Sequence, residues 1–241
     1  MKISILTMFP EMLDSLKQAP IIQHAQAKGI AEIEVIDIRQ YADGSFRDID
    51  DSPYGGGAGM IMRVGPLKRA LAAVKDADCF TILSAAAGVP YTQKKAHEYA
   101  AKTHLIILCG HYEGMDARIN DEVDEAVCIG DYIVSGGEYP AMIITDSIVR
   151  LLDGVIKKES TEEESFENGL LEYPQYTKPA VYDGMEVPSV LLSGDHEKIR
   201  LWRRKESLAV TLKYRPELLD ESSLSKEDQR LLNEIKENMH E

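Results

Sequence analysis

The sequence contains few cysteines and no long apolar run. Cys79, Cys109 and Cys128 are odd in number and have neither Cys-x-x-Cys nor Cys/His spacing, which argues against a disulfide framework or a zinc site. We therefore expect reduced thiols and a cytoplasmic location. Apolar runs such as 105–109 and 142–144 are far shorter than the roughly 20 residues of a membrane-spanning helix, so we expect a soluble protein with no membrane association.

Positive charge is also scarce. The chain has 27 Lys and Arg against 41 Asp and Glu, which gives a net charge of -14. This is the wrong sign for holding a nucleic acid by bulk electrostatics. Any nucleic-acid site must therefore be a local basic patch.

The segment 195–215 is the candidate for such a patch. It places seven basic residues around Trp202, opposed chiefly by three acidic residues of the same segment. Arginine beside an aromatic ring is suited to bind unpaired bases and phosphates. The alternative interpretation of this segment is an ordinary solvated helix face. The basic residues are Lys198, Arg200, Arg203, Arg204, Lys205, Lys213 and Arg215.

The first part of the chain alternates short β-branched runs with helical patterns. This alternation predicts an α/β fold with a mostly parallel sheet and helices on both faces. Ligands of such sheets bind beyond the carboxyl ends of the strands, here the loops after Ser84, Cys109 and Ile129. Strands are expected over 2–7, 33–38, 80–84, 104–109 and 126–129, and helices over 11–28, 66–74, 92–101 and 140–152.

The character of the sequence changes after residue 156. Glutamates crowd the segment 157–178, which has no helical or strand periodicity and is predicted to be an interdomain linker. Helical patterns return over 195–214 and 225–238. We therefore predict a first domain over 1–156 and a small all-α domain over 179–241.

Three clusters of residues are candidates for a functional site. The segment 50–60 has four glycines in five positions but matches neither a dinucleotide-binding nor a P-loop spacing, so a flexible loop and a substrate-contacting loop both remain open. The segment 110–118 places polar and aromatic side chains directly after an apolar strand. The apolar, glycine-rich segment 129–140 is suited to hold a flat heteroaromatic ring by backbone hydrogen bonds.

These clusters, in this order, resemble the bacterial tRNA (guanine-37-N1)-methyltransferases, which belong to the SPOUT superfamily of trefoil-knotted methyltransferases. The similarity runs from Met8 to Leu219, nearly the whole chain. It is carried by five long strings: Pro53-Tyr54-Gly55-Gly56-Gly57, Cys109-Gly110-His111-Tyr112-Glu113-Gly114, Ile129-Gly130-Asp131-Tyr132, Ser135-Gly136-Gly137-Glu138, and Gly184-Met185-Glu186-Val187-Pro188 through Leu191-Leu192-Ser193-Gly194.

The resemblance implies a fold, a cofactor and a substrate. It implies a deep trefoil knot in the first domain, a homodimer with a shared active site, and S-adenosylmethionine as methyl donor. The substrate implied is guanosine 37 in the anticodon loop of tRNA when guanosine also precedes it at 36, without indicating which tRNAs are used. A magnesium requirement stays open. The implied cofactor-binding residues are Gly110, Ile129, Gly130, Asp131, Tyr132, Ile133 and Val134.

The resemblance also implies two catalytic residues. Methylation of N1 requires a base for its proton and a cation or donor for the charge that develops at O6. Arg150 matches the family's arginine, and Glu164 stands where the family has an aspartate, with Glu163 or Glu162 as alternative bases. The helical domain is expected to hold the anticodon stem-loop through Arg200, Arg203, Arg204 and Lys205.

The sequence departs from the family pattern at two further places. Ala85-Ala86-Ala87-Gly88 follows the third strand, where Ser-Pro-Gln-Gly is usual, which affects a contact near the cofactor. Val210 and Tyr214 stand where the basic domain often has arginines. Two other functions compete with the methyltransferase: an enzyme acting on a small nucleotide, which has no use for the basic segment, and an RNA-binding module without catalysis.

Overall fold

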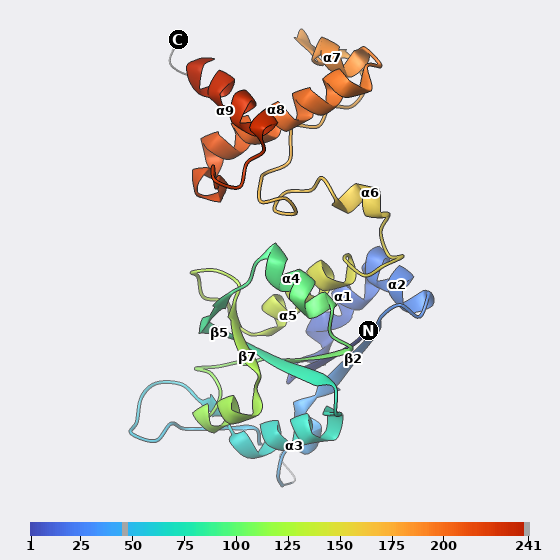
Figure 1. Cartoon of the computed structure of the whole chain (residues 1–241). Helices are drawn as coiled ribbons and strands as arrows, with labels where there is room; N and C mark the ends of the chain where they lie inside the picture. The colour runs from blue at the N-terminus through green and yellow to red at the C-terminus, as the bar shows by residue number, and fades with distance from the viewer. Residues whose placement is uncertain (45–47, 239–241) are drawn as a thin grey trace. The chain divides into compact units, whose positions relative to one another are not determined.

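The computed structural model describes residues 1–44 and 48–238, and the chain divides into two compact units. Unit 1 comprises residues 1–157 and unit 2 comprises residues 158–241. Each unit has its own core and is described by itself (Figure 1).

Unit 1 is built on a five-stranded sheet with the order β2-β1-β6-β5-β7, in which every pair of neighbours is parallel. A short antiparallel pair, β3 and β4, lies outside it. The strands are β1 (Lys2–Thr7), β2 (Glu32–Asp37), β3 (Asp50–Asp51), β4 (Ile61–Met62), β5 (Cys79–Pro90), β6 (His104–Leu108) and β7 (Glu125–Cys128).

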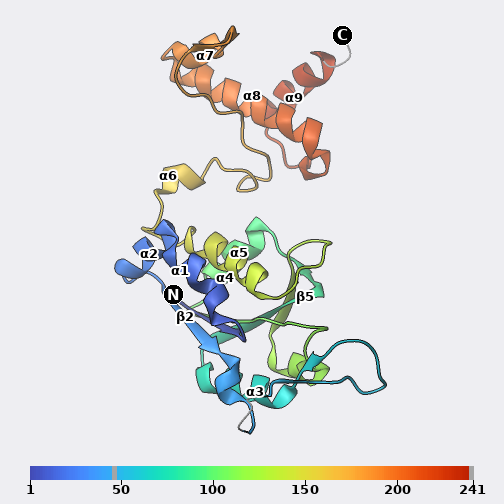
Figure 2. The ribbon, with the colours of Figure 1, turned by 180° about the vertical axis from the view of Figure 1, so that it is seen from behind.

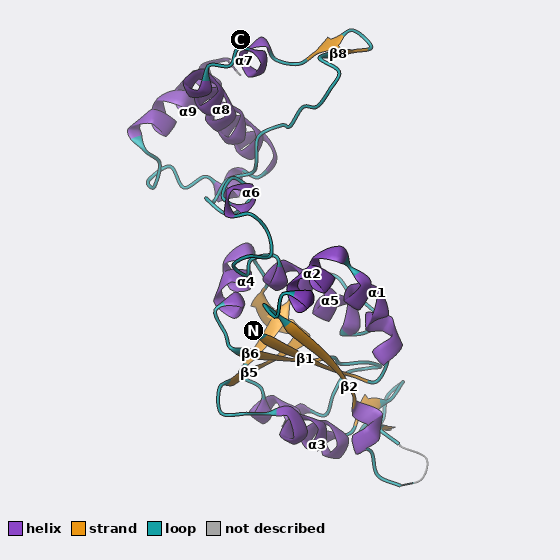
Figure 3. Cartoon of the chain, turned by 90° about the vertical axis from the view of Figure 1, so that its right-hand side faces the viewer, coloured by secondary structure: helices purple, strands orange, loops and turns teal. Residues whose placement is uncertain are grey.

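Helices cover both faces of this sheet, as Figure 3 shows. α1, α2, α4 and α5 pack on one face, and α3 packs on the other together with the 3-10 turns η2 and η3. This confirms the predicted α/β architecture with a parallel sheet. The helices are η1 (Pro10–Leu13), α1 (Asp14–Gln18), α2 (Pro20–Ala27), η2 (Ile38–Tyr41), α3 (Val64–Val74), α4 (Gln93–Ala100), η3 (Ala117–Glu122) and α5 (Glu138–Val149).

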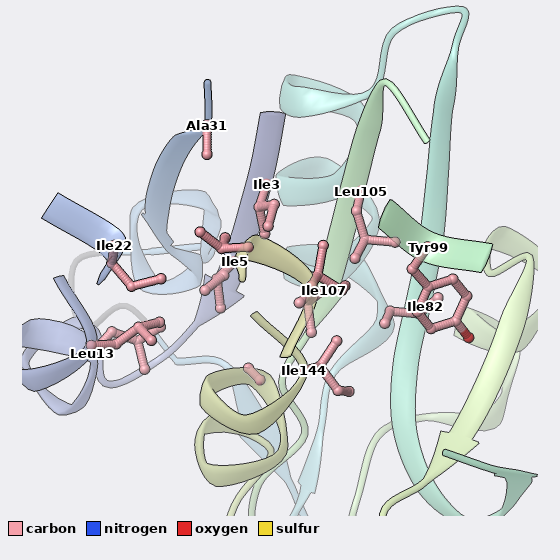
Figure 4. Packing of buried hydrophobic residues seen from close by; sticks show 14 of the residues in the cluster. Ile3, Ile5, Leu13, Ile22, Ala31, Ile82, Tyr99, Leu105, Ile107 and Ile144 are labelled. Atoms are coloured by element: carbon pink, nitrogen blue, oxygen red, sulfur yellow. The ribbon is translucent and has the colours of Figure 1, made fainter. Parts of the chain in front are cut away.

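The central strands are buried on both faces because helices cover both. All five residues of β6 are buried. Successive side chains of a strand point to opposite faces, so Leu105 and Ile107 join the cluster under α5, whereas Ile106 and Leu108 join the cluster under α3. Figure 4 shows Ile107 close to Ile5 of β1 and Ile144 of α5. The core thus fixes the carboxyl ends of β5, β6 and β7.

Two elements of unit 1 differ from the sequence-based expectation. The helix expected over 11–28 is broken at Ala19, whose ψ of 130° is extended, because a residue before proline is disfavoured in the α region. β5 continues to Pro90, well past Ser84, with an irregular register between Ser84 and Val89.

Unit 2 is mostly helical. It contains α6 (Lys158–Thr161), β8 (Val181–Tyr182), β9 (Met185–Glu186), α7 (Ser189–Leu192), α8 (His196–Tyr214), η4 (Pro216–Leu218) and α9 (Lys226–Asn238). α8 and α9 match the helices expected over 195–214 and 225–238. Their contact, visible from behind in Figure 2, buries Leu208, Leu231 and Ile235.

The β8–β9 hairpin departs from the expected all-α unit. It turns at Asp183 and Gly184, which both have positive φ, and an Asp-Gly pair favours this type of turn. In the described part of the chain, no helix has both the length and the apolar character needed to cross a membrane.

Candidate functional site

A cavity of about 360 Å³ lies at the carboxyl ends of β6 and β7, beside the middle of β5. Its walls come from residues 84–86 within β5, from the loops 110–115 and 128–137, and from Pro140 at the start of α5. The loops after β6 and β7 meet here because parallel strands end at the same edge of the sheet. The size falls within the range of small-molecule sites.

Six of the seven residues proposed for cofactor binding line this cavity: Gly110, Ile129, Gly130, Tyr132, Ile133 and Val134. Asp131 belongs to the same loop and is exposed, but it is not part of the lining. The proposed set did not include Ser84, Ala85 and Ala86, which also form a wall. The stretch after Ser84 was expected to lie where ligands of the sheet bind, and Ala85 and Ala86 depart from the family pattern, but none of the three residues was assigned to the cofactor.

The loops after β6 and β7 approach each other with no room for a side chain between them. The Gly137 amide donates to the Gly110 carbonyl at 2.7 Å, and His111 bridges Gly136. A Cβ on Gly137 would lie 2.7 Å from Cys109 Cα. Gly137 therefore permits a backbone-to-backbone contact that any larger residue would force apart.

Glu138 connects these loops to β1 through a buried hydrogen bond. Its side chain is fully buried, and the Thr7 hydroxyl donates to its Oε1 at 2.6 Å. Thr7 Oγ1 in turn accepts from the Phe9 amide at 2.9 Å. Glu138 is the first residue of α5, where the helix dipole favours a negative charge. The link from Glu138 to β1 has no signal in the sequence, because Thr7 and Glu138 are 131 positions apart.

Two buried polar atoms beside these loops have no hydrogen-bond partner among the described residues: Glu138 Oε2 and His111 Nδ1. The thiol of Cys109, at the end of β6, is also enclosed. Burial, and to a lesser extent the charge of Glu138, raises the pKa of the Cys109 thiol well above its usual range. Cys109 therefore stays protonated and acts as core filler, as expected from the sequence.

The loop after β7 and the outer face of α5 present apolar side chains to solvent. Ile133 is 88% exposed and Tyr132 57%. Tyr139 and Ile143, on α5, are also exposed. A patch of this kind next to a cavity is typical of an interaction surface.

The glycine-rich loop 52–60 is hydrogen-bonded at its base to the segment 110–118. It projects from unit 1 in Figures 1 and 2, and Tyr54 at its tip is fully exposed. At its base the Glu113 amide donates to the Met60 carbonyl at 3.1 Å, and the Met62 amide donates to the Gly114 carbonyl at 2.9 Å. The loop is therefore fixed to a wall of the cavity while its tip stays open.

The two proposed catalytic residues lie in different units. Arg150 is the half-buried C-cap of α5 in unit 1, and its amide donates to the Asp146 carbonyl. Glu164 lies in unit 2, in the turns that follow α6, and its amide donates to the Thr161 carbonyl at 3.3 Å. Of the alternative bases, Glu163 accepts a hydrogen bond from the Tyr173 hydroxyl at 2.6 Å, and Glu162 lies one residue earlier in the same turns.

The basic segment is less positive than its own residues indicate, because α9 brings carboxylates to it. Arg200 pairs with Glu197 and Glu227, Arg204 with Asp228, and Lys205 with Glu234. Arg203 lies 3.6 Å from Glu163.

No group of three or more His, Cys, Asp or Glu side chains is arranged to hold a metal ion within residues 1–44 and 48–238.

The structure is that of an α/β protein with a cavity lined by the glycine-rich loops after β6 and β7 and by the middle of β5. Residues 1–221 match the family model described as tRNA (Guanine-1)-methyltransferase TrmD. The chain belongs to this family, which confirms the resemblance read from the sequence motifs.

Curated relatives are similar over essentially the whole chain. A tRNA (guanine-N(1)-)-methyltransferase of Dictyoglomus turgidum is 47% identical over 242 aligned positions, covering 100% of this chain and 99% of the relative. The protein of the same name from Carboxydothermus hydrogenoformans is 50% identical, covering 96% and 92%. That from Geobacillus kaustophilus is 48% identical, covering 97% and 98%.

Proposed function

We propose that this protein transfers a methyl group from S-adenosylmethionine to N1 of guanosine 37 in the anticodon loop of tRNA, in the cytoplasm. The observation that carries the proposal is the cavity at the carboxyl ends of β6 and β7, which is lined by six of the seven residues that the resemblance implies for cofactor binding. The printed names of the relatives support tRNA and guanine N1 as substrate and target.

The cavity suits the cofactor in size and chemistry. Ile129, Ile133 and Val134 offer apolar contacts for a purine ring. Backbone groups of the same loop offer the hydrogen bonds that orient such a ring. When bound, S-adenosylmethionine supplies an electrophilic methyl group on a positively charged sulfur.

Two residues of the chain act on the proton of N1 and on the negative charge that develops at O6. N1 of guanine carries a proton at neutral pH, so Glu164 would accept that proton when N1 takes up the methyl group, while the carbon–sulfur bond breaks and S-adenosylhomocysteine leaves. Arg150 stabilises the negative charge that develops at O6. Glutamate has one methylene more than the family's aspartate, so the turns around Glu164 must set its carboxylate back by about one bond length.

We further propose that the protein forms a homodimer and that the two domains and the linker have separate roles. The exposed Ile133, Tyr139 and Ile143 beside the cavity support a dimer that covers this face of α5. The contact of Gly137 with Cys109 and Gly110 supports a trefoil knot at the same loops.

In this proposal domain 1–156 binds the cofactor, the linker 157–178 carries the base, and domain 179–241 binds tRNA.

The deciding experiment measures methyl incorporation from labelled S-adenosylmethionine into an unmodified tRNA transcript with guanosine at 36 and 37. A methyl group on N1 blocks Watson–Crick pairing, so reverse transcription should stop at position 37. A second transcript with adenosine at 36 tests the sequence requirement. Tight tRNA binding without methyl incorporation would favour an RNA-binding module instead.

A further inference from the structure

A buried carboxylate lies directly against one glycine of the cavity wall in unit 1. This glycine is Gly136, which lines the cavity and is itself buried. A Cβ on Gly136 would lie 2.3 Å from Glu138 Oε2 and 2.6 Å from His111 Cδ2. The Glu138 carboxylate therefore reaches the wall at a position where no side chain can stand.

Two features of the structure stabilise a negative charge on Glu138. The Thr7 hydroxyl, whose oxygen accepts from the Phe9 amide, donates to Oε1 at 2.6 Å. Glu138 is also the first residue of α5, where the helix dipole favours an anion. Oε2 has no hydrogen-bond partner among the described residues, so no lysine or arginine of this part of the chain donates to it.

The charge of Glu138 acts over a distance because it is buried. Its side chain has no exposed surface, and charges interact more strongly in a protein interior than in water. The field of Glu138 reaches the Cys109 thiol, where it contributes to the raised pKa of that group. Gly110, the next residue, lines the cavity. The cavity wall therefore lies within reach of this field.

A negative charge behind the wall distinguishes ligands by their charge. S-adenosylmethionine and S-adenosylhomocysteine differ by one methyl group and by the positive charge that it places on sulfur. The apolar contacts and backbone hydrogen bonds of the loop 129–134 are open to both compounds, so they contribute little to a preference between them. Glu113 also lines the cavity, but it is exposed, so water and salt screen its charge.

We propose that Glu138 selects the positively charged methyl donor over the product that is neutral at sulfur, through the field of its carboxylate and without direct contact. The proposal rests on the proposed function and adds a specificity-determining residue to it. Selectivity is a difference between two affinities, and this difference changes when the methyl group leaves. Loss of the charge on sulfur then favours release of S-adenosylhomocysteine.

The experiment measures dissociation constants by titration calorimetry on the full-length protein without tRNA, so that no methyl transfer occurs. The probes are S-adenosylmethionine, S-adenosylhomocysteine and sinefungin, which carries a protonated amine in place of the sulfonium group. Glu138→Gln keeps the shape but removes the charge. It should weaken binding of the two cationic compounds about tenfold relative to S-adenosylhomocysteine.

Glu138→Asp separates the charge from a structural role. Aspartate keeps the charge but is too short to keep the bond from Thr7 in place. This variant should therefore retain the preference for the cationic compounds while binding all three more weakly. Equal loss of the preference in Glu138→Asp and Glu138→Gln would show that the side chain only supports the loops, and would overturn the proposal.

Two exposed carboxylates provide the comparison. Glu98→Gln is the matched control, because it removes an exposed charge from α4 outside the cavity lining and should leave the preference unchanged. Glu113→Gln tests the other carboxylate of the lining. Loss of the preference in Glu113→Gln, with a normal preference in Glu138→Gln, would overturn the proposal.

Wild type supplies a second measurement that does not depend on the folding of a variant. A buried charge is screened little by salt, so the preference for the cationic compounds should change less than about twofold between about 0.1 and 0.5 M salt. Equal affinities of wild type for all three compounds, or a preference that disappears in salt, would contradict the assignment to Glu138.

Failure of this proposal and failure of the proposed function give different results. If wild type binds none of the three compounds, S-adenosylmethionine is not the donor, and the role of Glu138 falls with it. If wild type binds all three and Glu138→Gln keeps the preference, the role of Glu138 alone is contradicted, and the proposed methyl transfer stands.

Discussion

Arg204 and Asp228 form a bidentate ion pair that joins α8 to α9. Arg204 Nε donates to Asp228 Oδ1 at 2.6 Å, and Nη2 donates to Oδ2 at 3.0 Å. The Asp228 side chain is 8% exposed and also accepts from the Ser225 hydroxyl at 2.7 Å. Arg204, proposed from the sequence as a tRNA contact, therefore also takes part in the packing of unit 2.

We expect Asp228→Ala to destabilise unit 2 by about 1–3 kcal/mol, the usual cost of removing a partner from a charged hydrogen bond in a buried place. Denaturant unfolding followed by Trp202 fluorescence measures this. Glu217→Ala is the control, because its pair with Arg215 is exposed and should contribute little. Equal stability of the two variants would show that the α8–α9 contact does not depend on the pair.

The same pair predicts a pH dependence. The hydrogen bonds from Arg204 lower the pKa of Asp228 below its usual value of 3.8. A carboxylate with a lowered folded-state pKa stabilises the fold above its unfolded pKa, and this contribution disappears as the pH falls through the folded pKa. The stability difference between wild type and Asp228→Asn should therefore shrink below about pH 4. A difference that grows on acidification would contradict the assignment.

Gly137→Ala should disrupt the cofactor cavity, because the added Cβ would lie 2.7 Å from Cys109 Cα and 2.8 Å from the Gly110 amide nitrogen. Overpacking of this kind costs about 1–3 kcal/mol. S-adenosylhomocysteine should raise the melting temperature of wild type but not of this variant. Gly65→Ala, on α3 and outside the cavity lining, is the control, because its added Cβ would meet only the flexible end of the Arg69 side chain, and it should keep the ligand-induced shift.

Glu164→Gln should slow methyl transfer by about 10²- to 10⁴-fold, the usual loss when a general base is removed. Glutamine keeps the size and can still accept a hydrogen bond, so tRNA affinity should change little. Single-turnover kinetics with saturating tRNA separate the two effects. Loss of rate in Glu163→Gln with a normal rate in Glu164→Gln would move the role of base to Glu163.

Arg150→Lys tests charge stabilisation at O6. Lysine keeps the positive charge but not the planar fork, so we expect most of the single-turnover rate to be lost while the affinity for S-adenosylhomocysteine is kept. An active lysine variant would reduce Arg150 to a general electrostatic role.

The sheet could be predicted from the sequence because its strands are short segments rich in apolar and β-branched residues that alternate with helical patterns. His104–Leu108 is buried throughout, and such a run between turn residues is typical of a parallel strand covered on both faces. The break at Ala19 was also available from Pro20 but was outweighed by the apolar periodicity on either side. The knot that the family resemblance implies has no local signal in the sequence, since threading depends on which loop passes another.

Part of the candidate site could likewise be predicted from the sequence, and part of it could not. Gly110 and the loop 129–134 follow strand ends, so their place at the cavity follows from strand direction alone. The link from Thr7 to Glu138 joins residues 131 positions apart and cannot be inferred from spacing. The pairing of Lys205 with Glu234 likewise depends on the packing of α8 against α9.

The last prediction concerns which cations contact tRNA phosphates. Arg200 and Lys205 make exposed ion pairs, which are weak in water and screened by salt, so phosphates can replace their carboxylate partners. Neutralising both residues should weaken tRNA binding and reduce the slope of log affinity against log salt by about 0.7–0.9 for each lost contact. Because the net charge is -14, few other cations are available to compensate. Lys236→Ala, which removes a charge from α9, is the control and should leave the slope unchanged. A wild-type slope in the double variant would show that tRNA binds another surface of the protein.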